Sequence, residues 1–387
     1  MYPIAVATSK MVGSTGRLSH TATPETIPAP LTDRDIRSAV CTARPPTTMP
    51  DCSAMCTTEV SVMWALLIPI LRAATMLAAF ADGIGARLYG YSLSLNGNIG
   101  VNFYMELSEE IAANESTYML FTLPNGTTER VSVADAIQKN IDGKTYYVFS
   151  YEVAAKEMTA EIKARIISGD AQGTEYTYSV KDYADYILKH PEDFGESAKL
   201  VNLVTAMLNY GAYSQTYFDY NTQNLANSVL TDEQKQLPDT TAGELSSYEC
   251  SYTANVSYTG DTAYYGSSLV LKSETDIKHY FSYNSSVSLE AFTCTDSTGN
   301  SYEIEQSGNY LYVRVANIAA NKLRETVTLT LCENDVEVGT ITYSPLSYAY
   351  SILSASSTDD ALKNMVKALY QYYLTADAYF NPQQPAE

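Results

Sequence analysis

The 387-residue sequence has few of the side chains that most often carry enzyme chemistry. It contains three histidines and one tryptophan, and only His190 and His279 lie beyond Ala81. Neither histidine has a serine or cysteine in a recognisable catalytic setting, and the patterns G-x-S-x-G and H-E-x-x-H are absent. These gaps disfavour the serine, cysteine and zinc hydrolases.

Positive charge is also scarce. The chain has 24 Lys and Arg against 44 Asp and Glu, a formal net charge of −20 at pH 7. The excess of negative charge belongs to the region beyond Ala81, because the segment before it holds nearly equal numbers of acidic and basic side chains. A surface this acidic repels phosphate backbones and anionic lipids. We therefore expect neither a nucleic-acid partner nor binding to a membrane surface.

The cysteines form no recognisable framework. Cys250, Cys294 and Cys332 lie in the same part of the chain, are odd in number and are far apart in the sequence. This pattern fits neither a disulfide scaffold nor a zinc site. We expect mostly buried thiols that pack as small hydrophobic groups, and whether one pair is bridged stays open. The cysteines are Cys41, Cys52, Cys56, Cys250, Cys294 and Cys332.

No cofactor or metal motif is complete. Asp142–Thr145 ends in Gly-Lys-Thr, but Gln138 stands where a phosphate-binding loop needs glycine, so this stretch predicts a hairpin turn. Asp296–Asn300 is rich in oxygen-bearing side chains but lacks the length and the closing glutamate of a calcium loop. It predicts a turn, with calcium binding as the alternative. We expect no cofactor.

The segment before Asp82 differs from the rest. Residues 1–58 are rich in Thr, Pro, Ser and Arg without periodicity, and we expect a disordered leader or a stretch foreign to the natural protein. Residues 59–81 are apolar, contain Pro69 and Arg72, and end in Ala-Phe-Ala. This is typical of a signal peptide cleaved after Ala81, with a packed hydrophobic helix as the alternative. A charge in mid-span argues against a stable membrane span.

Residues 85–220 change from strands to helices. Turn signals at Asn96-Gly97, Pro124–Gly126 and Asp142-Gly143 separate about seven short alternating segments, which predicts an antiparallel sandwich of immunoglobulin or fibronectin type. Ser179 and Asp182 then form a capping-box pattern, and the helix that follows ends at His190-Pro191. A second helix over Ser197–Phe218 completes a predicted helical hairpin.

The second helix has a clear apolar face, and the same face returns near the end of the chain. Ser344-Pro345 likewise starts a helix in the place of Ser179. Residues 248–382 therefore predict a second sandwich and helical hairpin, residues 221–247 a polar linker, and the whole an α+β, mainly β tandem. The paired residues are Leu200, Leu203, Val204, Met207, Leu208 and Gly211 with Leu362, Met365, Val366, Leu369, Tyr370 and Tyr373.

Two features distinguish the helix Ser197–Phe218 from its copy. Gly211 stands where the copy has Tyr373, so this helix can approach a neighbour closely. Its outer face carries Asn209 and Gln215, whose chemistry the copy does not repeat.

Tyrosine is abundant, with 33 residues, and clusters near the ends of both long helices. Exposed tyrosines stack on sugars or anchor a protein partner, whereas buried ones would fill the space between helices and sandwich. We take as a candidate binding surface Tyr210, Tyr213, Tyr217, Tyr220, Tyr372 and Tyr379.

Four stretches carry a resemblance to a known group of proteins. The segments 91–107, 153–158, 178–188 and 203–227 resemble a module of large secreted or surface proteins of gut Clostridia, over about residues 85–381. The resemblance implies an extracellular or cell-surface location. It transfers no catalytic residues, because the family has none assigned.

These observations favour a non-catalytic secreted or cell-surface tandem module that binds carbohydrate or protein, or acts as a spacer. The alternative is a polysaccharide-acting secreted hydrolase or its accessory region. The acidic neighbours Glu109-Glu110 and Asp359-Asp360 are unsuited to that chemistry, because catalytic carboxylates face each other across a cleft. A row of exposed tyrosines on a sheet would favour sugar binding, whereas a deep pocket with two facing carboxylates would favour the hydrolase.

Overall fold

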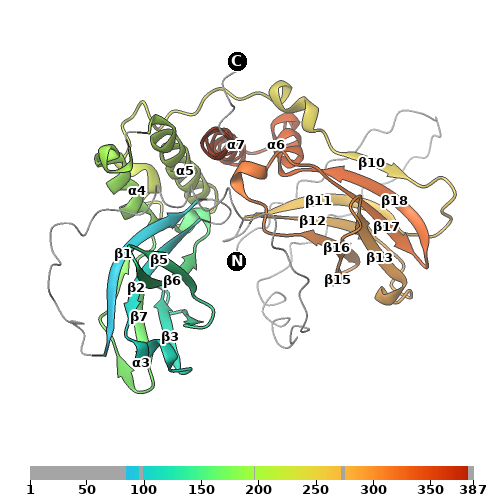
Figure 1. Ribbon diagram of the computed structural model, residues 1–387. Coiled ribbons are helices and arrows are strands. Elements are labelled where there is room, and N and C mark those ends of the chain that lie inside the picture. Colours follow the sequence, from blue (N-terminus) through green and yellow to red (C-terminus); the bar gives the residue numbers. More distant parts are fainter. Residues whose placement is uncertain (1–83, 96–98, 196, 272–274, 382–387) are drawn as a thin grey trace, which may run out of the picture.

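The computed structural model describes residues 84–95, 99–195, 197–271 and 275–381 (Figure 1). The expected leader at 1–58, the signal-like segment at 59–81 and the Asn96-Gly97 turn lie outside these ranges. The chain is mainly β, with four antiparallel sheets and several helices, as predicted at this level. Among the described residues, no helix is both long and apolar enough to span a membrane.

The first half of the chain holds two of the sheets. One has the strand order β1-β2-β6-β5, and the other has the order β4-β3-β7-β8, with β9 also paired to β7. The strands are β1 (Ala86–Ser94), β2 (Gly100–Leu107), β3 (Thr117–Thr122), β4 (Thr128–Ser132), β5 (Ile137–Ile141), β6 (Lys144–Glu152), β7 (Ile162–Ser168), β8 (Ala171–Gln172) and β9 (Tyr176–Tyr178).

The second half holds the other two sheets. They run β11-β12-β16-β15 and β10-β18-β17-β13-β14. The strands are β10 (Ser251–Ala254), β11 (Ala263–Leu271), β12 (Thr275–Ser282), β13 (Phe292–Asp296), β14 (Ser301–Tyr302), β15 (Ile304–Ser307), β16 (Tyr310–Val315), β17 (Val327–Glu333) and β18 (Val336–Tyr343).

Local turn chemistry explains several of these strand pairs. Pro124–Gly126 lies between the antiparallel strands β3 and β4, and Gly126 has a φ of +81°. Asp142 and Gly143 have φ values of +52° and +80°, as a two-residue hairpin turn requires, and they join β5 to β6. The Gly-Lys-Thr sequence therefore enters a strand, as predicted. Strand β5 and the short helix α3 (Glu109–Ala113) were not expected.

Four longer helices lie where helices were predicted. They are α4 (Val180–Lys189), α5 (Ala198–Tyr217), α6 (Pro345–Ser354) and α7 (Asp360–Phe380). The Ser179 hydroxyl accepts a hydrogen bond from the backbone N–H of Asp182, and His190 ends α4. Ser197 caps α5 in the same way, and Pro345 occupies the first turn of α6 after the cap Ser344.

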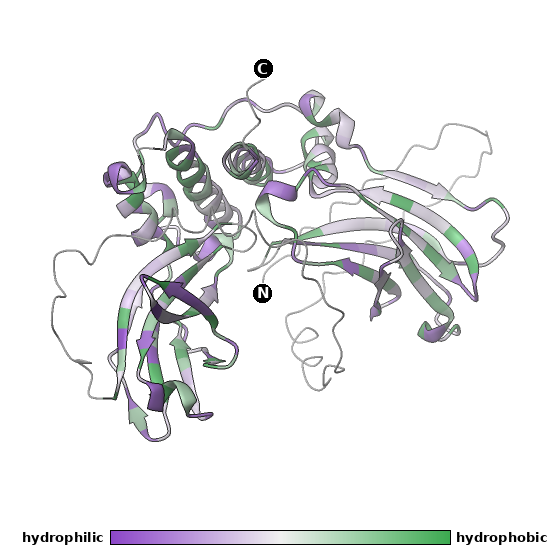
Figure 2. Cartoon of the chain, viewed as in Figure 1, coloured by the Kyte–Doolittle hydropathy of each residue, from purple (hydrophilic) through white to green (hydrophobic). Residues whose placement is uncertain are grey.

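Helices α5 and α7 form the main contact between the two β-rich bodies. They lie side by side at the top of Figure 1, with α4 and α6 on their outer sides. Hydrophobic residues gather on α5 and alternate along the strands (Figure 2). A single cluster of buried apolar side chains runs from the strands of the first half through both helices into the second half. The two halves therefore share one continuous core.

The polar segment 221–247 connects the halves and also packs against both long helices. It contains the short 3-10 helix Ala226–Val229 and most of a second one, Ala242–Tyr248, and it buries Leu230 and Leu245. These leucines anchor a segment whose other side chains are mostly exposed.

Candidate functional site

Two of the six predicted surface tyrosines are in the interior. Tyr210 on α5 and Tyr372 on α7 are 4% and 2% exposed, and their rings stack with centroids 5.8 Å apart. Burial raises the pKa of both hydroxyls above its usual value. The prediction that Tyr210 and Tyr372 belong to an exposed binding surface is therefore wrong, because the apolar faces of α5 and α7 pack against each other.

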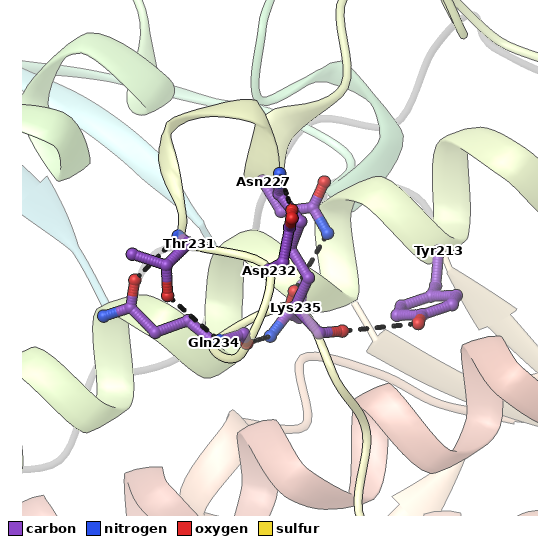
Figure 3. Close-up of polar contacts among 7 residues, drawn as sticks. Tyr213, Asn227, Thr231, Asp232, Gln234 and Lys235 are labelled. Carbon is purple, nitrogen blue, oxygen red and sulfur yellow. Dashed lines mark hydrogen bonds and ion pairs between the residues drawn. The ribbon is translucent and has the colours of Figure 1, made fainter.

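The other four tyrosines are half-buried and do not form one face. The Tyr213 hydroxyl donates to the backbone carbonyl of Lys235 over 3.4 Å (Figure 3). Tyr217 packs edge-to-face on Phe218, and Tyr379 packs in the same way on Phe380. Near Tyr220, the Lys156 ammonium lies 5.3 Å from the ring centroid. These contacts match the alternative in which the tyrosines fill the spaces around the helices.

The segment 221–247 covers the polar face of α5, which is why that face is not exposed. The Asn209 side chain donates to the carbonyl of Gln234 over 2.7 Å and accepts from Asn227 over 2.9 Å. Gln215 is completely buried and accepts from the backbone N–H of Ala226 over 2.7 Å. The prediction that Asn209 and Gln215 lie on the exposed outer face of this helix is therefore wrong. On α7, Gln371 occupies the position equivalent to Asn209 and donates to the Thr240 hydroxyl of the same segment, so the expectation that the copy lacks this chemistry is wrong at Asn209.

A pair of tyrosines that sequence reasoning missed occupies the same place in both halves. Tyr89 lies 4.2 Å from Tyr146, and Tyr265 lies 4.4 Å from Tyr310, measured between ring centroids. In each half the first tyrosine sits at a β-bulge, between Leu88 and Gly90 on β1 and between Tyr264 and Gly266 on β11. A bulge inserts one residue and re-aims a side chain, so both rings leave the regular alternation of their strands.

The outer face of the second-half sheet β11-β12-β16-β15 continues from this pair. Tyr280 and Tyr312 lie side by side, with centroids 5.6 Å apart. Lys278 places its ammonium 3.9 Å from the Tyr312 centroid, and the Tyr312 hydroxyl donates to Glu305. Tyrosine, lysine and glutamate side chains therefore share this face, which we call the β11 face. It comprises Tyr265, Lys278, Tyr280, Glu305, Tyr310 and Tyr312.

The corresponding face of the first half is closed. Tyr104 and Tyr146 are 1% and 5% exposed, and Ile141 packs against them. Beside them, Asn102 donates to Ser92 over 2.9 Å and accepts from Ser150 over 2.6 Å. The polar groups here are satisfied within the sheet.

A pocket of about 560 Å³ lies beside the first-half strands. It is lined by Glu129, Glu152 and Glu157, together with Lys156 and with Leu271 from the second half. Partial burial raises the pKa of Glu129 above its usual value, and repulsion from Glu152 adds to the effect. Among the described residues that line a pocket, Glu129 therefore has the carboxyl best suited to donate a proton.

The acidic neighbours considered from sequence have structural roles. Glu109 and Glu110 form the first turn of α3, and Asp359 caps α7 by accepting from the backbone N–H of Ala361. Asp296 accepts hydrogen bonds from Thr298 and Asn300, which lower its pKa and close the predicted turn. Within the described ranges, no group of three or more His, Cys, Asp and Glu residues is placed to hold a metal ion.

His279 is buried in the core of the second half. Its Nδ1 lies 2.6 Å from the Ser267 hydroxyl, which in turn lies 2.7 Å from the Tyr264 hydroxyl. Its Nε2 is buried and has no hydrogen-bond partner among the described residues. Burial lowers the pKa of the imidazole to about 3, so the ring is neutral at pH 7. A serine–histidine contact exists here, but it lies where no substrate reaches.

The three described cysteines are free thiols. Cys294 is buried and faces the core, whereas Cys250 and Cys332 are half-buried. Burial raises the pKa of Cys250 to about 11 and that of Cys294 to about 12, so thiolate nucleophiles are disfavoured at neutral pH. None of these three cysteines therefore forms a disulfide bond, which answers the question that the sequence left open.

Comparison with known proteins adds no further constraint on this geometry. No protein-family model and no curated protein matches the chain.

Proposed function

We propose that the chain is a non-catalytic, secreted or cell-surface tandem module that binds a ligand through an exposed aromatic sheet face. In this proposal each half is one copy of an immunoglobulin-like sandwich followed by a helical hairpin. The observation that carries it is Tyr265 on the β11 face, which is exposed and packs on the half-buried Tyr310.

The agreement between the two halves supports the duplication. Ser92 contacts the Tyr104 hydroxyl on β1 and β2, and Ser268 contacts the Tyr280 hydroxyl on β11 and β12, so the two contacts occupy equivalent places in their sheets. The bulges of β1 and β11 lie at equivalent places too, the same number of positions before each serine. A shared bulge and a shared cross-strand contact require the same register, which two unrelated sheets would seldom reproduce.

The exposure of Tyr265 supports a binding role. Its side chain is 44% exposed, and among the described strands of this sheet it is the large hydrophobic residue left open to solvent. In the first half the equivalent residue Tyr89 is half-buried, and its partner Tyr146 is buried.

Binding assays with the intact chain test this proposal. The purified protein would be screened against a glycan array and against defined extracellular matrix and mucin proteins, as wild type, Tyr265→Ala and Tyr310→Ala. We expect at least one ligand whose binding both variants weaken. Binding that neither substitution changes, or no binding to any ligand class, would contradict a ligand site on the β11 face.

The pocket around Glu129 supports a second candidate, a polysaccharide-acting hydrolase. A general acid needs a raised pKa and a second carboxylate nearby, and Glu129, whose pKa is raised, lines this pocket together with Glu152. A broad screen of polysaccharides for reducing-end release tests it. Hydrolysis that Glu129→Gln abolishes, while Glu110→Gln on α3 leaves it intact, would favour the hydrolase over the non-catalytic proposal.

A further inference from the structure

We propose that Tyr265 and Tyr310 are a site of oxidative cross-linking, at which a one-electron oxidant derived from hydrogen peroxide joins the two rings by a carbon–carbon bond. The product is an intramolecular dityrosine that connects strands β11 and β16. The cross-link is independent of the proposed binding function, because it concerns the covalent chemistry of the ring pair itself.

Tyr265 is the described tyrosine that a dissolved oxidant reaches most easily. Its side chain is 44% exposed, whereas every other tyrosine within the described ranges is buried or half-buried. Its nearest aromatic neighbour is another tyrosine, the half-buried Tyr310. A radical formed on the exposed ring therefore has a second phenol beside it.

The side chains that usually compete with tyrosine for an oxidant are shielded in the described part of the chain. The only tryptophan, Trp64, lies outside the described ranges. Oxidation of sulfur follows exposure and, for cysteine, thiolate character. The three described thiols are buried or half-buried, and their pKa values are raised. The described methionines are all buried: Met105, Met119, Met158, Met207 and Met365.

The two rings already lie in contact. Their centroids are 4.4 Å apart, and their planes are inclined by 39°. A hydrogen bond with the Tyr265 hydroxyl, together with desolvation, raises the pKa of Tyr310 above its usual value. Phenoxyl radicals couple through the Cε atom next to the hydroxyl, so contact between the two hydroxyls also brings the two reacting carbons close together.

The backbone explains how rings from two strands that are not neighbours can meet. Strand β12 lies between β11 and β16, so the backbones of β11 and β16 are about 10 Å apart, twice the usual strand spacing. Ser282 of β12 is directly opposite both Ala263 and Tyr310. Directly opposite residues share a face of the sheet, and the small side chains of Ala263 and Ser282 leave room for the rings above them. The bulge at Tyr265 turns its ring towards Tyr310.

The coupling balances without any group held by the protein. Each ring gives one electron to the oxidant and the proton of its hydroxyl to water, which leaves two phenoxyl radicals. The radicals combine into one Cε–Cε bond, and the hydrogen on each joined carbon then passes to the phenolic oxygen, which restores both hydroxyls. The protein loses two hydrogen atoms in all, and one molecule of hydrogen peroxide accepts them and becomes two molecules of water.

The new bond would act as a staple. It joins β11 to β16 across β12, two segments that the sequence separates by the whole of β12 to β15. A covalent link between distant segments restricts the unfolded chain more than the folded one. We therefore expect the cross-linked protein to resist unfolding better than the untreated protein.

The first half provides a matched pair in a closed setting. Tyr89 and Tyr146 have centroids 4.2 Å apart and planes inclined by 35°, almost the geometry of Tyr265 and Tyr310. However, Tyr146 is 5% exposed and Tyr89 is half-buried. Comparing the two pairs separates the effect of ring contact from that of access, and we expect the cross-link in the second half and not in the first.

Oxidation of the purified intact chain tests the proposal. The protein would be treated with hydrogen peroxide and a heme peroxidase, at a concentration low enough to limit contact between molecules, and then digested for mass spectrometry. We expect two peptides joined through Tyr265 and Tyr310, lighter than their sum by two hydrogen atoms, and dityrosine fluorescence from the monomer. Tyr265→Phe and Tyr310→Phe should each lose both signals, because phenylalanine has no hydroxyl from which the radical forms. Tyr89→Phe should keep both signals, and circular dichroism would verify that all variants are folded.

Urea denaturation of the same samples tests the staple. Treatment with the oxidant should shift the midpoint of the wild type to higher urea and should not shift that of Tyr265→Phe. An unchanged midpoint in the cross-linked wild type would overturn the stabilising role of the bond. Equal cross-linking of Tyr89 to Tyr146 would overturn the selection by exposure. Oxidation that reaches Tyr265 without joining it to Tyr310, or that consumes the thiols and leaves both rings intact, would overturn the site.

Discussion

The rings of Tyr210 and Tyr372 stack on each other with an angle of 16° between their planes. The two tyrosines are equivalent positions of the repeated helix, because the interval between them is the one that relates the apolar faces of α5 and α7. A residue that meets its own counterpart is characteristic of an isologous contact, the kind that joins two identical subunits around a two-fold axis. The contact between α5 and α7 therefore resembles a homodimer interface formed inside one chain.

Truncating either ring should destabilise the whole molecule, because the cavity would open in the core shared by both halves. We expect Tyr210→Ala and Tyr372→Ala each to lower the free energy of unfolding by about 3–5 kcal/mol, the range for large aromatic-to-alanine changes. Urea denaturation followed by circular dichroism measures this. Tyr372→Phe is the matched control: the Tyr372 hydroxyl is buried without a partner among the described residues, so its removal should be neutral or stabilising by about 1 kcal/mol.

The same contact predicts that the halves stay together without a covalent link. A protease site inserted between Asp232 and Glu233, both exposed, would allow the folded chain to be nicked. We expect the nicked protein to elute as one particle of unchanged mass in size-exclusion chromatography with light scattering, because α5 and α7 remain buried against each other. Combining the nick with Tyr210→Ala should promote separation. Fragments that separate readily without that substitution would contradict an interface of this strength.

Local chemistry explains which parts of the fold could be predicted from sequence. Ser179, Ser197 and Ser344 mark helix starts because a cap needs only a side-chain oxygen next to free backbone N–H groups. Asp142-Gly143 marks a hairpin because few residues tolerate positive φ. The pairing of α5 with α7 carries no such signal, since an apolar helix face would fit its own sheets equally well. Long-range choices of this kind depend on the whole surface of both partners.

The candidate site was harder to predict, for two physical reasons. The spacing of Tyr210 and Tyr213 places them on α5 but does not say that Tyr210 meets α7 or that Lys235 covers Tyr213. Tyr265 lies at a bulge, where the two-residue period of the strand is broken, so the alternation of side chains cannot assign its face. Only the repeated Tyr-Gly-x-Ser pattern, at residues 89–92 on β1 and 265–268 on β11, could have directed attention to it.

Gly211 tests the predicted close approach of α5. A Cβ at this position would lie 2.7 Å from the Met158 sulfur, 3.0 Å from the Ala226 Cβ and 3.1 Å from the Ala155 carbonyl oxygen. We expect Gly211→Ala to cost about 1–3 kcal/mol of stability, despite the better helix propensity of alanine, because the Ala155 backbone cannot yield as a flexible side chain does. Asn202→Ala, at an exposed position of the same helix, should be neutral or slightly stabilising in the same denaturation experiment.

His279 should make the stability of the protein depend on pH. Its pKa is about 3 in the folded chain against 6.5 for an unperturbed histidine, so between these values the unfolded state binds more protons. Stability contributed by the neutral ring is fully present above pH 6.5 and should fall by up to about 1.4 kcal/mol per pH unit as the pH drops towards 3. Neighbouring Tyr264, Tyr343 and Cys250 stay neutral throughout this interval, because burial raises their pKa values.

The substitution His279→Phe isolates this term. In the first half the equivalent position holds Phe103, which is completely buried against Tyr91 and Phe121, so a phenyl ring has a precedent at this place in the fold. The free energy of unfolding, measured by urea denaturation from about pH 4 to about pH 8, should depend less steeply on pH in His279→Phe than in the wild type. His190→Phe serves as the control, because His190 is half exposed at the end of α4. If His279→Phe kept the full wild-type slope while folding normally, the loss of stability in acid would have to come from the carboxylates alone.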